Sequence, residues 1–179
     1  MKGYAHKIIT ASAAMLLGAP AIGVAGATLG STLPDIDIKL GIPHRTWTHY
    51  WPVYASGMAF VWYFEHTRHM TPLQHAGMVA LWWFFAGALF HILEDSFTKM
   101  GVPWIVPSNP KKRFSFGITT TGGFFEKFVV VAAVVAVFMK FPPATWSTGV
   151  LNMLKYNTPS MGAVGNEFWH FLNSINNLF

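Results

Sequence analysis

The stretch Leu73–Asp95, which reads LQHAGMVALWWFFAGALFHILED, decides the fold of this chain. Its first part, Leu73–Leu93, is largely apolar and has about the 20 residues that a helix needs to cross the hydrocarbon layer of a membrane. The stretch ends in His91 and Asp95, and ionisable side chains at such a position are costly and suggest function. It therefore predicts a transmembrane helix that carries polar chemistry at its end.

The composition of the whole chain agrees with a membrane protein. Of its 179 residues, 53% are hydrophobic, 16% are aromatic and only 11% are charged, against roughly 25% charged in a soluble domain. The length leaves room for one domain with about three to five spans. The net charge of +5 comes from basic residues that lie between apolar runs, which favours contacts with anionic lipid over nucleic acid. The chain has no cysteine, so a metal ion has to be held by histidine and carboxylate side chains.

Two further apolar stretches predict transmembrane helices beside the central one. Tyr50–Glu65 is apolar and aromatic, and the charged turn 65–69 joins it to the central stretch. We expect these two helices to form an antiparallel pair. Gly122–Phe141 predicts another span.

The N-terminal apolar stretch, Ala5–Leu33, predicts a helical hairpin. Gly18, Ala19 and Pro20 interrupt it, and proline disfavours helix at its own position and at the one before. The two resulting helices, over about residues 5–17 and 20–33, are too short for ordinary spans but suit a re-entrant hairpin. Its glycines and alanines are expected to let the two arms approach closely.

The same region also has features of a cleaved signal peptide, because Lys2 and Lys7 precede an apolar run that ends in small residues. We expect the segment to remain in the mature protein, since the run continues to Leu33 and the site described below needs His6.

The sequence thus predicts an all-α, polytopic integral membrane protein with a re-entrant N-terminal helical hairpin, about three transmembrane helices and interfacial C-terminal helices. The membrane-embedded domain covers residues 1–141, and residues 142–179 form a tail in which Trp146–Tyr156 and Val164–Leu178 look amphipathic. The hairpin places most basic residues on one side of the membrane, which the positive-inside rule makes cytoplasmic. These residues are Lys2, Lys7, Lys39, Arg45, Lys99, Lys111, Lys112 and Arg113.

Ionisable residues cluster at four places that this topology brings to the same membrane face. The four clusters are His6, Asp35 with Asp37, His44–His49, and His91 with Asp95. His91 and Asp95 are four residues apart, so on a helix they lie on one face and can bind one cation. Taken alone, this pair also suits a helix cap or an ion pair, and Asp35 and Asp37 suit a turn. Their convergence predicts a divalent metal site, with Zn as the first choice, Mn or Fe as alternatives, and room for more than one ion. The predicted metal ligands are His6, Asp35, Asp37, His49, His91 and Asp95.

Other polar residues have structural interpretations. We expect His66, His69, His75 and His170 to be structural or solvated. The basic run Lys111–Arg113 is expected to anchor lipid headgroups, with substrate phosphate as an alternative ligand.

Several motifs together resemble the bacterial membrane-bound metal-dependent hydrolases of the YdjM-like family. They are an early histidine, the turn Gly30–Asp37, the element His44–His49, and His91 with Asp95, followed by Thr98, Gly101, Val102 and Trp104–Pro107. The resemblance covers about residues 5–115. The family is in turn distantly similar to zinc-dependent phospholipases C and P1-type nucleases, which are all-helical enzymes with clustered zinc ions.

The resemblance and the clustered ligands imply a metal-dependent hydrolase, a multi-pass protein of the bacterial inner membrane with its metal site facing the cytoplasm. Because this site lies at the cytoplasmic interface and is rimmed by Arg45, Lys111, Lys112 and Arg113, we expect it to act on a phosphate ester of a membrane lipid. His44 and Arg45 are then the candidate catalytic residues, His44 also as a ligand or its hydrogen-bond partner and Arg45 as a phosphate clamp. The alternative is a non-catalytic metal-binding subunit that stabilises or regulates a partner complex. The expected partners are membrane lipid and, through the tail, a second copy or another membrane protein, with no nucleic acid.

Overall fold

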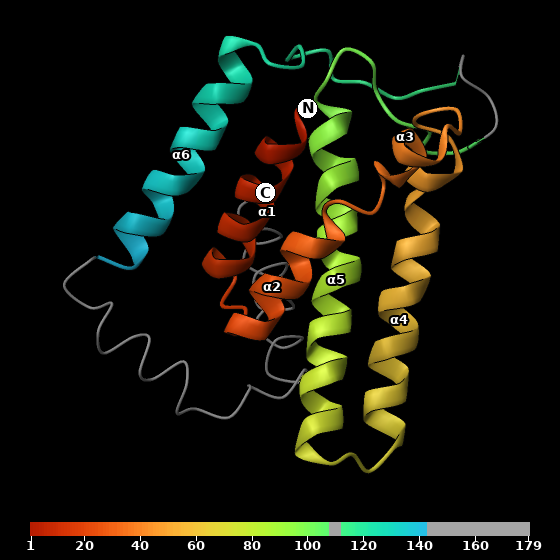
Figure 1. Ribbon diagram of the computed structural model, residues 1–179, viewed down its shortest axis with the longest axis vertical. Helices are drawn as coiled ribbons and strands as arrows, with labels where there is room; N and C mark the ends of the chain where they lie inside the picture. Colours follow the sequence, from red (N-terminus) through yellow and green to blue (C-terminus); the bar gives the residue numbers. More distant parts are fainter. Residues whose placement is uncertain (108–111, 143–179) are drawn as a thin grey trace, which may run out of the picture.

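The computed structural model of the chain describes residues 1–107 and 112–142 (Figure 1). This part is helical, and it contains no β-strand, so the prediction of an all-α fold is confirmed. Two isolated bridges, Thr98 with Thr119 and Val102 with Phe114, connect parts of the long loop after the central helix. The elements are α1 (Gly3–Leu16), α2 (Ala21–Gly30), α3 (Ile36–Leu40), the 3-10 turn η1 (Trp47–His49), α4 (Trp51–Thr67), α5 (Pro72–Ser96) and α6 (Phe124–Lys140).

Helix α5 is the central element, and α1, α2 and α4 all pack against it. It begins at a capping box in which the Thr71 hydroxyl accepts a hydrogen bond from the backbone N–H of Gln74, and Pro72 occupies the first turn, where proline is well tolerated. Figure 1 shows α4 running antiparallel beside α5, and α6 lying on the far side of α1. The predicted antiparallel pair and the predicted helix near residues 122–141 are therefore present.

The N-terminal hairpin is also present, with a turn at Gly18, whose φ is +83°, and Pro20 before the first residue of α2. The sequence analysis expected the glycines of the hairpin to face its other arm, and this prediction was wrong for Gly26 and Gly30. A Cβ atom on Gly26 or Gly30 would lie 2.3 Å from the carbonyl oxygen of Ala80 or 1.8 Å from that of Phe84, so both glycines face α5 rather than α1. Gly87 of α5 lies equally close to the backbone of α2. Backbone-to-backbone packing thus sets the position of α2 on the central helix.

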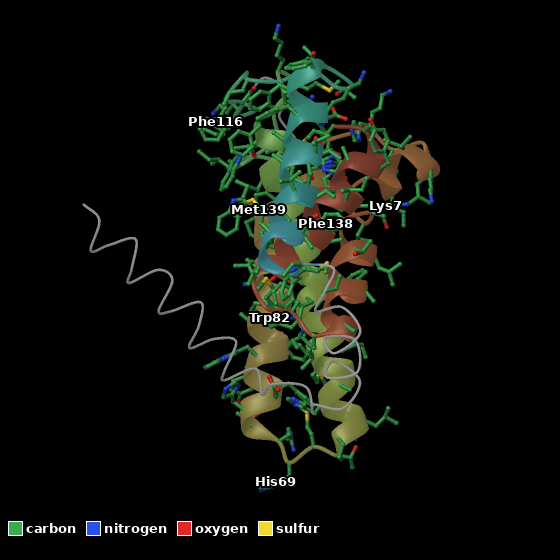
Figure 2. All side chains as sticks on the ribbon, turned by 90° about the vertical axis from the view of Figure 1, so that its left-hand side faces the viewer. Lys7, His69, Trp82, Phe116, Phe138 and Met139 are labelled. Atoms are coloured by element: carbon green, nitrogen blue, oxygen red, sulfur yellow. The ribbon has the colours of Figure 1, made fainter. Side chains whose placement is uncertain are left out.

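The number of spans predicted from the sequence is not confirmed. Among the described residues, α5 is the one helix that is long and apolar enough to cross a membrane. Helices α4 and α6 have 17 residues each. Large apolar side chains are nevertheless exposed on α4 and α6, and Figure 2 shows Met139 and Phe138 on α6. The two helices predicted in the tail lie outside the described residues.

A glycine-to-alanine pair tests the packing of α2 on α5. Gly30→Ala forces the two backbones apart and is expected to lower the free energy of unfolding by about 1–3 kcal/mol. Gly77→Ala is the matched control, because a Cβ at Gly77 of α5 meets nothing within 4 Å and alanine favours helix by up to about 1 kcal/mol. Thermal unfolding in detergent measures both, and equal stability of the two variants would contradict the packing described.

Candidate metal centre

Four segments meet at one end of α5 and bring together histidine and aspartate side chains. The first turns of α1 supply His6, the link after α2 supplies Asp35, η1 supplies His49, and the last turns of α5 supply His91 and Asp95. In Figure 1 this is the end at which the N-terminus, α3 and the end of α5 lie. The residues are buried except for Asp35, which is half-buried. The predicted convergence of the four clusters is confirmed.

The inner grouping consists of Asp35, His49, His91 and Asp95, and one donor atom from each lies within 4.8 Å of the others. The Nε2 atom of His91 lies 3.4 Å from Asp35 Oδ1 and 3.6 Å from Asp95 Oδ2. The Nε2 atom of His49 lies 3.6 Å from each of the same two oxygens. These separations are too long for good hydrogen bonds between nitrogen and oxygen.

The other ring nitrogen of each histidine fixes which nitrogen carries the proton. His91 Nδ1 lies 2.6 Å from the carbonyl oxygen of Ser31, and a carbonyl only accepts, so Nδ1 is the donor. His49 Nδ1 faces the hydroxyl of Thr48 at 3.2 Å, and that hydroxyl already donates to Asp37 at 2.6 Å. In the neutral form of both imidazoles, which is the form that binds a metal ion, the Nε2 lone pair is therefore directed at the carboxylates.

His6 is held in the same way by Glu94, a residue that the sequence analysis did not include in the site. Its Nδ1 donates to Glu94 Oε2 at 2.6 Å, and the Thr10 hydroxyl donates to the other carboxylate oxygen at 3.1 Å. His6 Nε2 then faces Asp95 Oδ1 at 3.3 Å. The signal that could have identified Glu94 is the criterion that identified Asp95, an acidic residue at the end of a membrane-length helix.

The arrangement satisfies a physical test for a cation site. The Nε2 atoms of His6, His49 and His91 are buried and have no hydrogen-bond partner among the described residues. Lone pairs and carboxylate oxygens that face one another in a buried space repel unless positive charge lies between them, either as protons on the imidazoles or as a bound cation. Asp95 already has the N-terminal ammonium of Met1 at 2.5 Å from Oδ1 and Arg45 at 2.7 Å from Oδ2. Donor atoms around a tetrahedral Zn ion, at about 2.0–2.1 Å from it, are about 3.4 Å apart, and the observed 3.4–3.6 Å agrees with that spacing. The residues therefore fit a divalent ion.

A second grouping of Asp37, His44 and His49 lies next to the first. Asp37 is fully buried, and its oxygens accept hydrogen bonds from the Thr48 hydroxyl at 2.6 Å and the Arg45 backbone N–H at 3.2 Å. His44 Nδ1 donates to Asp37 at 2.9 Å, and His44 Nε2 lies 3.9 Å from Asp35 Oδ1. Asp37 thus orients His44 and the 44–49 segment beside the inner grouping.

Arg45 occupies a different position from the one predicted, because it is buried and does not lie at the rim of the site. Its Nη2 donates to Asp95 Oδ2 at 2.7 Å, and its Nη1 donates to Thr98 and to the carbonyl of Gly101. Its φ of +58° is unusual for a residue other than glycine. Burial lowers the pKa of Arg45, and the carboxylate of Asp95 partly offsets this effect. The guanidinium supports a predicted metal ligand directly.

The carboxylates outside α5 are ionised at neutral pH and are ready to bind a cation. Burial alone raises the pKa of Asp35, but hydrogen bonds and positive charge from His49 and His91, which carry a proton on Nε2 when no cation is bound, outweigh it and hold that pKa well below its usual range. Burial likewise raises the pKa of Asp37, and Thr48 and His44 reverse the effect.

The remaining histidines in the described part lie away from the cluster. His75 pairs with Glu65 at 2.8 Å near the opposite end of α5, and His66 bonds to its own helix at Trp62. Figure 2 shows His69 at the end of the molecule opposite Phe116. His170 lies outside the described residues.

A buried group of histidines and aspartates at the end of a membrane-length helix defines the class, a membrane protein with a candidate metal centre. The chain belongs to the YdjM inner membrane protein family, whose model matches residues 1–161. No curated protein and no solved structure matches it. Membership confirms the family resemblance and an inner-membrane location, while the distant similarity to phospholipases C and P1-type nucleases finds no support in these comparisons.

The double change His91→Ala with Asp95→Ala tests the metal centre. It removes two donors of the inner grouping, and we expect metal affinity to fall more than about 100-fold, because even indirect support of a ligand is worth 10- to 100-fold. His75→Ala, on the same helix but far from the cluster, is the matched control. Elemental analysis of the purified proteins measures the result, and full metal occupancy in the double variant would refute the site.

Proposed function

We propose that this protein is a membrane-embedded, metal-dependent hydrolase that acts on a phosphate ester of a membrane lipid. The observation that carries the proposal is the set of three buried imidazole nitrogens without partners, those of His6, His49 and His91, directed at two carboxylates. Zn is the first choice of ion because the donors are nitrogen and oxygen at tetrahedral spacing, and Mn or Fe are alternatives.

The proposal assigns His49, His91, Asp35 and Asp95 to the ion, with His6 on the second oxygen of Asp95. His6 Nε2 and the N-terminal ammonium of Met1 both face Asp95 Oδ1, so a second ion on this side of the carboxylate would replace that ammonium. A divalent ion there lowers the pKa of water towards neutrality and polarises a phosphoryl oxygen. His44, whose Nδ1 is held by Asp37, presents its Nε2 beside Asp35 and is assigned to proton exchange with the substrate.

The position of the centre favours a lipid substrate. It lies at the end of α5, the helix of membrane length, and apolar side chains such as Trp47 and Ile38 are exposed on the segments that carry the donors. Basic residues on the adjoining loop, Lys99 and Lys112, are also exposed. An apolar surface with basic residues suits a phosphate-bearing headgroup at the membrane interface.

A second candidate function, a non-catalytic metal-binding subunit, is favoured by a different observation. His6, His49 and His91 are at most 1% exposed, which resembles the enclosed shell of a structural ion. In that case the ion joins α1, α2 and α5, and a partner complex or a second copy binds elsewhere, for instance through residues 142–179.

The proposed topology is multi-pass, with a re-entrant N-terminal hairpin and the metal centre facing the cytoplasm. Helices α4 and α6, with 17 residues each, are at the lower limit for a span. The contacts of His6 and Asp35 with the end of α5 support a hairpin whose two ends lie on one side.

Hydrolysis is tested with purified, metal-replete protein on phospholipids and phosphodiester reporters. We expect turnover in the wild type, and His44→Ala is expected to reduce it by about 10²–10⁴-fold with metal content unchanged, because it removes a proton-transfer group and no inner donor. His69→Ala, at the opposite end of the molecule, is the control. A fully metal-loaded protein that leaves every such ester intact would favour the non-catalytic alternative.

The topology is tested by labelling single cysteines introduced into this cysteine-free chain. Gly3→Cys and Lys39→Cys are expected to react with an impermeant thiol reagent from the cytoplasmic side, and Leu73→Cys from the opposite side. All three positions are exposed. Labelling of positions 3 and 39 from different sides would exclude the hairpin topology.

A further inference from the structure

The metal centre has one open edge. The side chains of Asp35, in the inner grouping, and of His44, in the second grouping, are 25% and 30% exposed. His49, His91 and Asp95, the other donors of the inner grouping, are buried. A substrate therefore reaches the centre beside Asp35 and His44. A phosphate group placed there brings its negative charge next to the carboxylates of Asp35 and Asp95, so the phosphate needs a cationic partner besides the ion.

Arg45 cannot serve as that partner in the observed arrangement. It is 3% exposed, and both of its terminal nitrogens donate to Asp95, Thr98 or Gly101. Turning the guanidinium towards a substrate would break its 2.7 Å ion pair with Asp95 Oδ2 and leave only the N-terminal ammonium of Met1, at Oδ1, on that buried carboxylate, which is costly in a buried site.

Arg113 lies at the open edge instead. Its Nη2 donates to the backbone carbonyl of His44 at 3.1 Å, and its Nε is buried and has no hydrogen-bond partner among the described residues. The neighbouring Phe114 exchanges two backbone hydrogen bonds of 2.9 Å with Val102, so the chain next to Arg113 is fixed. The guanidinium is held beside the site, and its Nε is a donor that no group in the described part of the chain uses.

We propose that Arg113 binds the phosphate group of the substrate at this edge, while Arg45 holds the metal ligand Asp95. The proposal rests on the proposed function and names the residue that recognises its substrate. A guanidinium offers a planar fork of donors that matches two phosphate oxygens. The positive charges of Arg113 and Arg45 also repel each other, and a bound anion relieves that repulsion.

The test measures binding of inorganic phosphate to the metal-loaded full chain in detergent by calorimetry. Arg113→Gln is expected to weaken phosphate binding at least about tenfold, the usual effect of removing a hydrogen bond to a charged group. Arg68→Gln, an exposed arginine in the turn at the opposite end of the molecule, removes the same charge and is expected to change phosphate binding less than about twofold. Arg113→Lys keeps the positive charge but loses the planar fork of donors, so its affinity for phosphate is expected to lie between those of Arg113→Gln and the control variant.

Metal content is measured for every variant, so that a folding defect is recognised. If Arg113→Gln loses its metal, its phosphate affinity is not interpreted, and the phosphate affinity of Arg113→Lys is compared with that of the wild type instead. Phosphate binding by a metal-loaded Arg113 variant that equals that of Arg68→Gln would overturn the proposal, as would a wild type that does not bind phosphate. Phosphate binding without any lipid hydrolysis would refute the proposed function and leave Arg113 as an anion ligand.

The source of the phosphate group is distinguished by repeating the titration in nanodiscs. If phosphatidylglycerol weakens the apparent affinity of the wild type for inorganic phosphate, and has no such effect on Arg113→Gln, a lipid headgroup occupies the site. If phosphatidylglycerol has no effect on either protein while inorganic phosphate still depends on Arg113, the ligand is a water-soluble phosphate compound.

Discussion

The close approach of the backbones of α2 and α5 is the constraint on which the rest of the structure depends. Gly30 lies against the carbonyl of Phe84, and Gly87 lies against that of Ala27. At this distance no side chain separates the helices, so the chain that leaves α2 passes directly over the last turns of α5. Ser31 can therefore accept the hydrogen bond of His91, and Asp35 can face the same imidazole.

The polar cluster follows a simple electrostatic rule once that position is set. Each imidazole uses one nitrogen to donate to a group that only accepts or has already donated, and the second nitrogen is thereby directed inward. Glu94 has this effect on His6, Ser31 on His91 and Thr48 on His49. In the described part of the chain, seven buried side-chain nitrogen or oxygen atoms lack a hydrogen-bond partner, and three of them are these inward-facing imidazole nitrogens. A fold that satisfies nearly every other buried polar group leaves this one place in need of positive charge.

Much of the fold could be predicted because local signals coincide with tertiary needs. Pro20 and Gly18 mark the hairpin turn, Thr71 and Pro72 mark the start of α5, and the spacing of His91 and Asp95 places both on one helical face. The partner of the glycine stripe could not be predicted, because small residues allow close approach without specifying which helix approaches. The burial of Arg45 was also beyond the sequence, since its left-handed backbone and its contact with Asp95 depend on how the 44–49 segment folds over α5. Glu94 acquires its role only when α1 brings His6 beside it.

The hydrogen bond from His91 to Ser31 has a consequence for the surrounding bilayer. Because Ser31 follows the last residue of α2, the distance between Asp35 and His91 depends on how far the hairpin lies along the axis of α5. A displacement by the 1.5 Å rise of a single residue is nearly half of the 3.4 Å that separates the two side chains. The donor spacing of the candidate centre is therefore kept only while the hairpin keeps its place along α5. Hydrophobic mismatch, which acts on short and long helices differently, is a force that would change this place in a bilayer.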